Sequence, residues 1–265
     1  MTASGPETVH VKAKICGIRS EEDLVKAHDA RAEAVGLICG LTHESPDGLT
    51  PVQARILSER AGAMWGDDEL TRTLVTHLRD AGQILELARN IGVERIQIHG
   101  EVTDETVRAV VDAAGELEVF RAVHVIGVTG DNAGDAQEAV QSALRAAEFG
   151  CHGVVLDTRT LDRLGGTGLV HDWKVSRQIV QALADTSTQV SLAGGLTPDN
   201  VHQAIDQVRP HSVDVNTGVE ELGELDKSAI KCAAFTTIAH SWTYSDHPLH
   251  ANFTEPKALL GAGAH

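Results

Sequence analysis

The stretch Gly153-Val154-Val155-Leu156-Asp157-Thr158 decides the fold of this chain. Three consecutive aliphatic side chains between Gly and Asp are typical of a strand buried on both faces, as in parallel sheets. A segment of helical periodicity, Asp135–Phe149, comes before it. The chain repeats this pairing of a short apolar run with a helical segment. The eight predicted strands are Val11–Gly17, Ala34–Gly40, Thr71–His77, Arg95–Gly100, Glu118–Val125, Gly153–Thr158, Gln189–Gly195 and Ser212–Gly218.

Start signals mark several of the helices between these strands. Ser20-Glu-Glu-Asp23 resembles a capping box, and Thr50-Pro51 places an N-cap Thr before a Pro at the first helical position. Thr197-Pro198 repeats the second arrangement. The remaining helices are expected over Asp80–Ile91, Asp104–Ala114, Asp135–Phe149, Asp172–Ala184 and Asp226–His240.

Eight successive strand and helix units predict the α/β class and a (β/α)₈ TIM barrel, formed as a single domain by residues 11–240. A doubly wound open sheet is the alternative. Residues 241–265 follow the last unit as a C-terminal extension, which contains the only tyrosine of the chain, Tyr244. We expect this extension to be flexible or packed on the surface.

The composition limits the possible partners. The chain has 265 residues, with 22 Lys and Arg against 38 Asp and Glu, and a formal charge of −16 at pH 7. No run of Lys or Arg offsets this charge, so neither nucleic acid nor a membrane surface is expected as a partner. Because no signal peptide pattern and no apolar window of about 18 residues is found, we expect a soluble cytoplasmic protein. The four cysteines, Cys16, Cys39, Cys151 and Cys232, lack the spacing of a zinc site.

Two reactive side chains lie where predicted strands end, which is the end of a parallel barrel that carries catalytic groups. Cys16 lies at the end of the first predicted strand and is a candidate base or nucleophile, although a lone cysteine is more often an inert core residue. Asp157 follows three aliphatic residues, where a carboxylate has to be paired or functional. Cys39 ends the second strand in the same Ile-Cys-Gly pattern, and core packing is the favoured interpretation for it. Cys16 and Asp157 are therefore the candidate catalytic residues.

Glycine-rich turns follow the last three predicted strands. Glycine allows the backbone to approach an oxyanion and to direct several N–H groups at it, and a helix that starts nearby adds its free donors. The late loops of such barrels often bind phosphate. None of the turns fits the GxGxxG or Walker pattern, so a dinucleotide or ATP is not indicated. The expected phosphate-binding residues are Gly166, Gly168, Gly194, Gly195, Thr217 and Gly218.

Seven motifs occur in a fixed order between Val11 and Ala239. They are Lys14-Ile-Cys-Gly-Ile18, Ile96-Gln-Ile-His-Gly100, Val155-Leu-Asp157, Gly165-Gly-Thr-Gly168, His171-Asp-Trp173, Leu192-Ala-Gly-Gly-Leu-Thr-Pro-Asp-Asn-Val201 and Val213-Asp-Val-Asn-Thr-Gly-Val-Glu220. This ordered set resembles the phosphoribosylanthranilate isomerase family of tryptophan biosynthesis. The resemblance implies a (β/α)₈ barrel and an Amadori rearrangement of N-(5-phosphoribosyl)anthranilate to its 1-deoxyribulose 5-phosphate isomer, an aldose–ketose isomerisation that uses no cofactor.

The resemblance also implies roles for individual residues. Asp157 corresponds to the general acid that protonates the ribose ring oxygen, and Cys16 to the general base that removes the C2 proton. The glycines of the last three loops correspond to the phosphate clamp. The residues expected to line the substrate are Lys14, His77, Gln97, His99, Arg121 and His124.

The sequence departs from the family at two places. The family has Ser-Pro-Arg after the second strand, where the Arg holds the anthranilate end of the substrate, whereas this chain has Ser45-Pro46-Asp47. Arg19, Arg121, Arg159 or Arg163 could replace that cation. In addition, His43, His77 and His124 join the family's His99 at strand ends. Isolated histidines at a rim are usually hydrogen-bonded polar residues rather than metal ligands.

These departures leave two alternatives beside the isomerase. The same barrel and phosphate clamp could act on a different sugar phosphate, as an isomerase or as a metal-dependent lyase or hydrolase that uses the histidines. The chain could also be a non-catalytic phosphosugar-binding protein. The expected partner is in each case a small phosphosugar, and a monomer and a homodimer are both compatible with the sequence.

Overall fold

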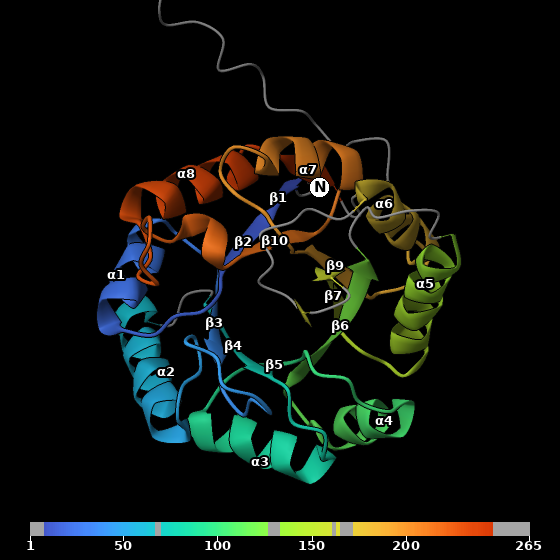
Figure 1. Cartoon of the computed structure of the whole chain (residues 1–265), viewed down its shortest axis with the longest axis horizontal. Coiled ribbons are helices and arrows are strands. Elements are labelled where there is room, and N and C mark those ends of the chain that lie inside the picture. Colours follow the sequence, from blue (N-terminus) through green and yellow to red (C-terminus); the bar gives the residue numbers. More distant parts are fainter. Residues whose placement is uncertain (1–7, 67–69, 127–132, 161–162, 165–171, 246–265) are drawn as a thin grey trace, which may run out of the picture.

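The structure is a computed structural model that describes residues 8–66, 70–126, 133–160, 163–164 and 172–245. Eight parallel strands within these ranges close into a barrel, and helices form a ring around them (Figure 1). The predicted (β/α)₈ barrel is therefore confirmed. In order around the barrel, the strands are β2 (Lys12–Ile15), β3 (Ala34–Ile38), β4 (Thr71–Thr76), β5 (Arg95–Ile98), β6 (Glu118–Ile126), β7 (Gly153–Thr160), β9 (Gln189–Leu192) and β10 (Ser212–Val215), which pairs again with β2.

The helices follow the strands as the periodicity predicts. At the start of α2, the Thr50 side chain accepts a hydrogen bond from the N–H of Gln53, whose side chain in turn accepts from the N–H of Thr50. This is the reciprocal arrangement of a capping box. The helices are α1 (Glu21–Asp29), α2 (Pro51–Trp65), α3 (Ala81–Ile91), α4 (Asp104–Ala113), α5 (Ala133–Glu148), α6 (Trp173–Ala182), α7 (Val201–Val208) and α8 (Ala229–His240).

One predicted helix start is wrong. Thr197-Pro198 does not begin a helix, because the N–H of Thr197 donates to the Oδ1 atom of Asn200 at 2.8 Å and the intervening residues form a turn. The helix α7 starts only after this turn, at Val201. The loop between β9 and α7 is therefore longer than the sequence indicated.

Alternate residues along each strand face opposite sides of the barrel wall. Phe120, Val155 and Ala193 form a small cluster of their own, separate from the large cluster that fills the space between strands and helices. Phe120 and Val155 lie on β6 and β7, and Ala193 directly follows β9, so this cluster marks the interior of the closed barrel. Residues an even number of positions from them on the same strand also face the interior.

Short strands add to the barrel at two places. At its N-terminal end, β1 (Thr8–His10) pairs antiparallel with β11 (Thr243–Ser245), and Trp242 beside β11 is buried. At the other end, β8 (Arg163–Leu164) pairs antiparallel with the end of β7. The expected C-terminal extension thus begins with residues that pair with β1, and its residues 246–265 lie outside the described ranges.

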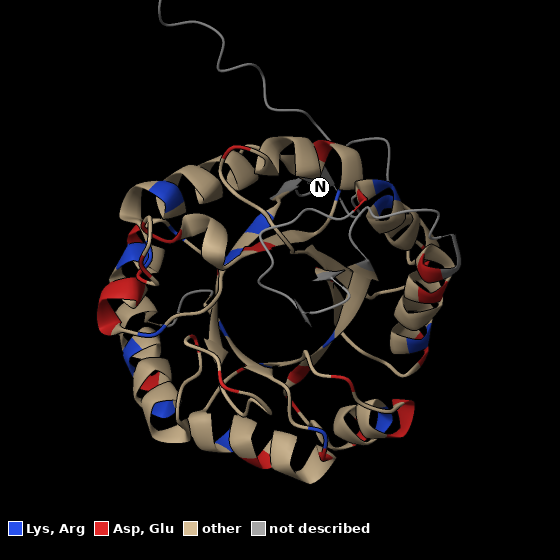
Figure 2. Cartoon of the chain, in the orientation of Figure 1, with Lys and Arg blue, Asp and Glu red and all other residues tan. Residues whose placement is uncertain are grey.

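Most acidic and basic residues of the helices lie on the outer ring of the molecule (Figure 2). The acidic excess therefore lies mainly on the outer surface, and the barrel interior carries few charged side chains. Within the described residues, no helix has the length and apolar character needed to cross a membrane.

Candidate active site

Lys14 and Cys16 belong to the interior of the barrel. The Nζ atom of Lys14, on β2, donates to Oε1 of Gln97 on β5 at 2.6 Å and to Oδ2 of Asp214 on the neighbouring β10 at 2.7 Å. Cys16 lies two residues further on and faces the same side, and its Sγ would lie 2.5 Å from a Cβ at Gly36. Burial alone would lower the pKa of Lys14, but the Asp214 carboxylate outweighs it and raises that pKa. A fixed ammonium group therefore lies beside the thiol.

The thiol of Cys16 is protonated in this environment at neutral pH. Burial raises its pKa to about 11, although the charge of Lys14 acts in the opposite direction. Cys39, the competing thiol, faces the other side of its strand and belongs to the large apolar cluster. Of these two cysteines, only Cys16 faces the barrel interior.

Asp157 lies near the C-terminal end of β7 and also faces the interior, two residues after Val155. Its Oδ1 atom accepts the N–H of Thr158 at 2.8 Å, and its Oδ2 atom lies 3.3 Å from Nε2 of His99. Burial would raise the pKa of Asp157, but the hydrogen bond and charge of His99, with help from His124 and the Thr158 N–H, lower it. Asp157 is thus a carboxylate that is held at both oxygens.

Four histidines form a row that ends at this carboxylate. Ring centroids are 5.0 Å apart for His43 and His77, 5.2 Å for His77 and His99, and 5.1 Å for His99 and His124. Burial, followed by the charges of neighbouring histidines, lowers the pKa of His77 to about 3; burial and His99 lower that of His124 to about 4. His77 and His124 are therefore neutral near pH 7, and they line the site as uncharged polar rings.

The catalytic candidates lie on strands separated by two others, since β10 and β9 come between β2 and β7. A thiol and a carboxylate thus approach the barrel mouth from different directions, as two proton transfers at different atoms require. The structure gathers five of the six predicted lining residues in the interior: Lys14, His77, Gln97, His99 and His124.

Arg121 is the exception among the predicted lining residues. It lies three positions before His124 on β6, so it faces the opposite side of the barrel wall. Its guanidinium donates to the carbonyl oxygen of Gly100 at 2.7 Å. Side chains alternate between the two faces of a strand, so the three-residue spacing of Arg121 and His124 already places them on opposite faces from sequence alone.

The expected phosphate site is described in part. Gly194 and Gly195 have left-handed backbones, with φ of +81° and +67°, and the described residues include no acceptor for either N–H. A Cβ at Gly218 would lie 1.9 Å from the carbonyl oxygen of Leu196, so the turns after β9 and β10 touch each other through this glycine. Thr217 and Gly218 form part of a short 3₁₀ helix, Thr217–Val219. Gly166 and Gly168 lie outside the described residues.

The Asp47 side chain is hydrogen-bonded within the protein. Its Oδ2 atom accepts a hydrogen bond from Nδ2 of Asn216 at 3.0 Å, and Oδ1 of Asn216 accepts from Nζ of Lys227 at 2.6 Å. Of the four arginines considered as replacements, Arg19 pairs with Asp226 at 2.9 Å, Arg121 faces away, and the side chains of Arg159 and Arg163 lie outside the described residues.

Two interior residues were missed at the level of sequence. Asp214 fixes Lys14, and Asn216 connects Asp47 with Lys227. The signal was present in Val213-Asp214-Val215-Asn216, where polar residues alternate with valine as in a strand with one polar face. Their partners could not be inferred, because they lie in distant parts of the chain.

The donor atoms of His99, His124 and Asp157 lie within 4.8 Å of one another, so this group could also hold a metal ion. As it stands, the site combines an inward carboxylate, an inward thiol and glycine turns at one rim of a closed barrel. These features are those of a (β/α)₈ barrel enzyme of the acid–base type.

Comparison with known proteins gives the family. Residues 13–235 match the family model of N-(5'-phosphoribosyl)anthranilate isomerase. The enzyme of that name numbered 2 from Methanosarcina mazei is 34% identical over 213 residues, which cover 80% of this chain and 86% of the relative. The one from Haloferax volcanii is 34% identical over 237 residues, covering 89% and 97%. The chain therefore belongs to the N-(5'-phosphoribosyl)anthranilate isomerase family.

Solved structures agree with this assignment. The phosphoribosyl anthranilate isomerase of Thermotoga maritima is 29% identical, with a TM-score of 0.69 and coverage of 86% of this chain and 98% of that one. A structure of such an isomerase with reduced 1-(o-carboxyphenylamino)-1-deoxyribulose 5-phosphate is 28% identical, with a TM-score of 0.66 and coverage of 86% and 98%. The predictions of the family and of an isomerase are confirmed, and the alternatives of another sugar phosphate, metal-dependent chemistry or mere binding are not favoured.

Proposed function

We propose that this chain converts N-(5'-phosphoribosyl)anthranilate to 1-(o-carboxyphenylamino)-1-deoxyribulose 5-phosphate, with Asp157 as general acid and Cys16 as general base. The observation that carries the proposal is the placement of one carboxyl group and one thiol inside the same barrel mouth, on strands separated by two others. Family membership supports the substrate, and the related structure with a phosphate-bearing analogue supports a phosphosugar ligand.

The proposed reaction moves two protons. Asp157 gives its proton to the ribose ring oxygen, the bond from C1 to that oxygen breaks, and the amine lone pair forms an iminium. The Cys16 thiolate then takes the proton from C2, and the electrons of the C–H bond form an enolamine that tautomerises to the ketone. Lys14, beside the thiol, stabilises the thiolate that this step consumes. Gly194, Gly195, Thr217 and Gly218, with Gly166 and Gly168 of the preceding loop, hold the phosphate through backbone N–H groups.

The place of the protein in the cell stays a prediction. We expect it in the cytoplasm, as a monomer or a homodimer; a related isomerase from Thermotoga maritima is described as a dimer from which monomers were generated.

Complementation of a tryptophan auxotroph that lacks this isomerase tests the function. Growth without tryptophan is expected for the wild-type chain and not for Asp157→Asn, provided that both are produced as folded protein. Absence of growth with the folded wild-type chain contradicts the proposed substrate.

A further inference from the structure

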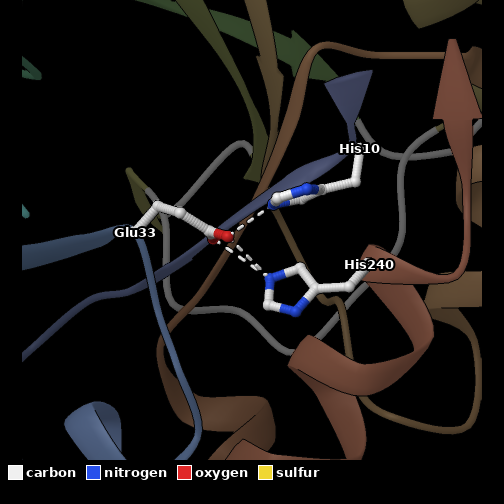
Figure 3. A group of neighbouring side chains, drawn as sticks. All are labelled: His10, Glu33 and His240. Atoms are coloured by element: carbon white, nitrogen blue, oxygen red, sulfur yellow. Dashed lines mark hydrogen bonds and ion pairs between the residues drawn. The ribbon is translucent and has the colours of Figure 1, made fainter. Parts of the chain in front are cut away.

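Three side chains from distant parts of the sequence meet at one carboxylate (Figure 3). They lie at the N-terminal end of the barrel, opposite to the candidate active site, because Glu33 directly precedes β3. His10 ends β1, and His240 ends α8. The Nε2 atoms of His10 and His240 lie 2.7 Å and 2.9 Å from Oε1 of Glu33. Both imidazoles thus direct the same ring nitrogen at one carboxylate.

Two imidazole nitrogens and a carboxylate oxygen form the donor set of many zinc sites with an open fourth position. The donor atoms of His10, Glu33 and His240 all lie within 4.8 Å of one another. Ligand atoms around a tetrahedral zinc ion are separated by about 3.4 Å, given bond lengths of about 2.0–2.2 Å. The rings would therefore move outward by only about 0.5 Å to admit an ion in place of the shared protons.

We propose that His10, Glu33 and His240 form a binding site for a divalent cation of the zinc class, which fastens β1 and the end of α8 to the barrel.

The surroundings of the carboxylate favour this role. The Oε2 atom of Glu33 also accepts the N–H of Ala13 at 2.9 Å, a contact that fixes the orientation of the ligand in the way that outer partners do at metal sites. The side chains of Glu33 and His240 are 14% and 24% exposed, whereas that of His10 is 44% exposed. An ion can therefore enter beside His10, and a water molecule can complete its coordination there.

The location makes the expected effect structural. His240 is the last residue of α8, and a cation near the C-terminal end of a helix is favoured by the helix dipole. The three ligands come together only in the folded chain, so binding stabilises the folded state. Since the site lies at the end of the barrel opposite to Asp157, it is not expected to take part in the reaction.

Untagged protein freed of metal with a chelator tests the proposal by calorimetric titration with Zn²⁺ and by the melting temperature. We expect one Zn²⁺ at this site and a higher melting temperature with Zn²⁺ than with chelator. Loss of an outer-shell partner weakens metal binding by about 10- to 100-fold. His10→Ala and His240→Ala each remove a direct ligand, so each should weaken Zn²⁺ binding by at least this factor. Glu33→Gln keeps an acceptor for the N–H of Ala13, so it tests the carboxylate ligand without removing that contact.

Two further variants separate this site from other imidazoles. His28 pairs with Asp29 at 3.3 Å but has no third donor in the described structure, so His28→Ala should leave the affinity unchanged. His124→Gln removes one donor of the group at the active site, and it should leave both the affinity and the rise in melting temperature intact. Three results would each overturn the proposal. They are absence of Zn²⁺ binding by the wild type, wild-type affinity in His10→Ala or His240→Ala, and loss of the Zn²⁺-dependent rise in melting temperature in His124→Gln.

Discussion

Cys16 and Asp157 together hold one proton near neutral pH. That proton is on the thiol, because the pKa of Cys16 is raised to about 11 and that of Asp157 is lowered. The proposed reaction starts from the opposite arrangement, with a carboxylic acid and a thiolate. Both arrangements contain the same number of protons, so their ratio does not depend on pH between the two pKa values.

The pH dependence of kcat/KM follows from this proton count. We expect a plateau across pH 7 to 10, a fall above the Cys16 pKa of about 11, where the pair has lost its proton, and a fall at acid pH, where both groups are protonated. Steady-state kinetics across this range measures it. A tenfold rise per pH unit through the neutral range is the contrary result, since it requires a base that ionises independently of the acid.

Removal of either group should abolish turnover and spare binding. Asp157→Asn and Cys16→Ala are each expected to lower kcat by at least about 100-fold, because a positioned acid or base contributes about 10²- to 10⁴-fold. Affinity for inorganic phosphate, measured by calorimetry, should change little. Cys39→Ala is the matched control, as this thiol faces the apolar cluster. Full activity of either catalytic variant contradicts the assignment.

The sequence indicated the reactive residues better than their partners. Cys16, Asp157 and His99 could be placed at the rim because each lies near the end of a predicted strand. The contacts that set their chemistry, such as Lys14 with Asp214 or His99 with Asp157, join residues far apart in the chain. Only the closed barrel brings these pairs together, so neither the raised pKa of Cys16 nor the carboxylate of Asp157 could be read from local sequence.

At the scale of elements, the turns after β9 and β10 depend on close contact at one glycine. A Cβ at Gly218 would lie 1.9 Å from the Leu196 carbonyl oxygen, so Gly218→Ala has to move one turn away from the other. We expect weaker phosphate binding and a higher KM, by about 10- to 100-fold, because small displacements of positioning groups carry costs of this size.

Gly223→Ala serves as the control for that variant. Gly223 has a φ of +79°, but a Cβ there meets no atom within 4 Å, so only backbone strain is added. Calorimetric titration with inorganic phosphate compares the two variants. Equal affinities would show that contact between the turns does not position the phosphate site.

Element boundaries could be predicted where the signal is local. Thr50-Pro51 and Ser20 begin helices as expected, because each cap bonds within its own turn. Thr197-Pro198 has the same appearance but lies in a turn closed by Asn200. The pairing of β1 with β11 was not expected at all, since it joins the two ends of the chain's described part.

At the scale of the whole molecule, the neutral histidines of the site make folding sensitive to acid. Their pKa values of about 3 for His77 and about 4 for His124 lie below the unfolded value of about 6.5. The unfolded chain therefore binds more protons as pH falls, and stability is lost from about pH 6.5 down toward these values.

Urea unfolding at pH 7 and at pH 4.5 measures this effect. Between these two pH values, the free energy of unfolding of the wild-type chain should fall more than that of a His77→Asn, His124→Asn double variant. The difference is on the order of 1.4 kcal/mol per histidine for each pH unit below about 6.5. The variant keeps polar side chains and lacks the two titrations. Parallel losses in both proteins would show that the histidines are not held neutral by the fold.

The barrel itself could be predicted from the number of strand and helix units and from the length. What the count could not show is how closure places His10, Glu33 and His240 at one end and the catalytic pair at the other. These groupings depend on the three-dimensional register of the strands.

The central claim is that this barrel isomerises N-(5'-phosphoribosyl)anthranilate through Asp157 and Cys16. Chromatographic measurement of product formation from that substrate by purified wild-type protein, Asp157→Asn and Cys16→Ala tests it most directly. The account predicts stoichiometric conversion to 1-(o-carboxyphenylamino)-1-deoxyribulose 5-phosphate by the wild type and no more than about 1% of that rate in either variant. No conversion by the folded wild-type protein, or unchanged rates in the variants, would contradict it.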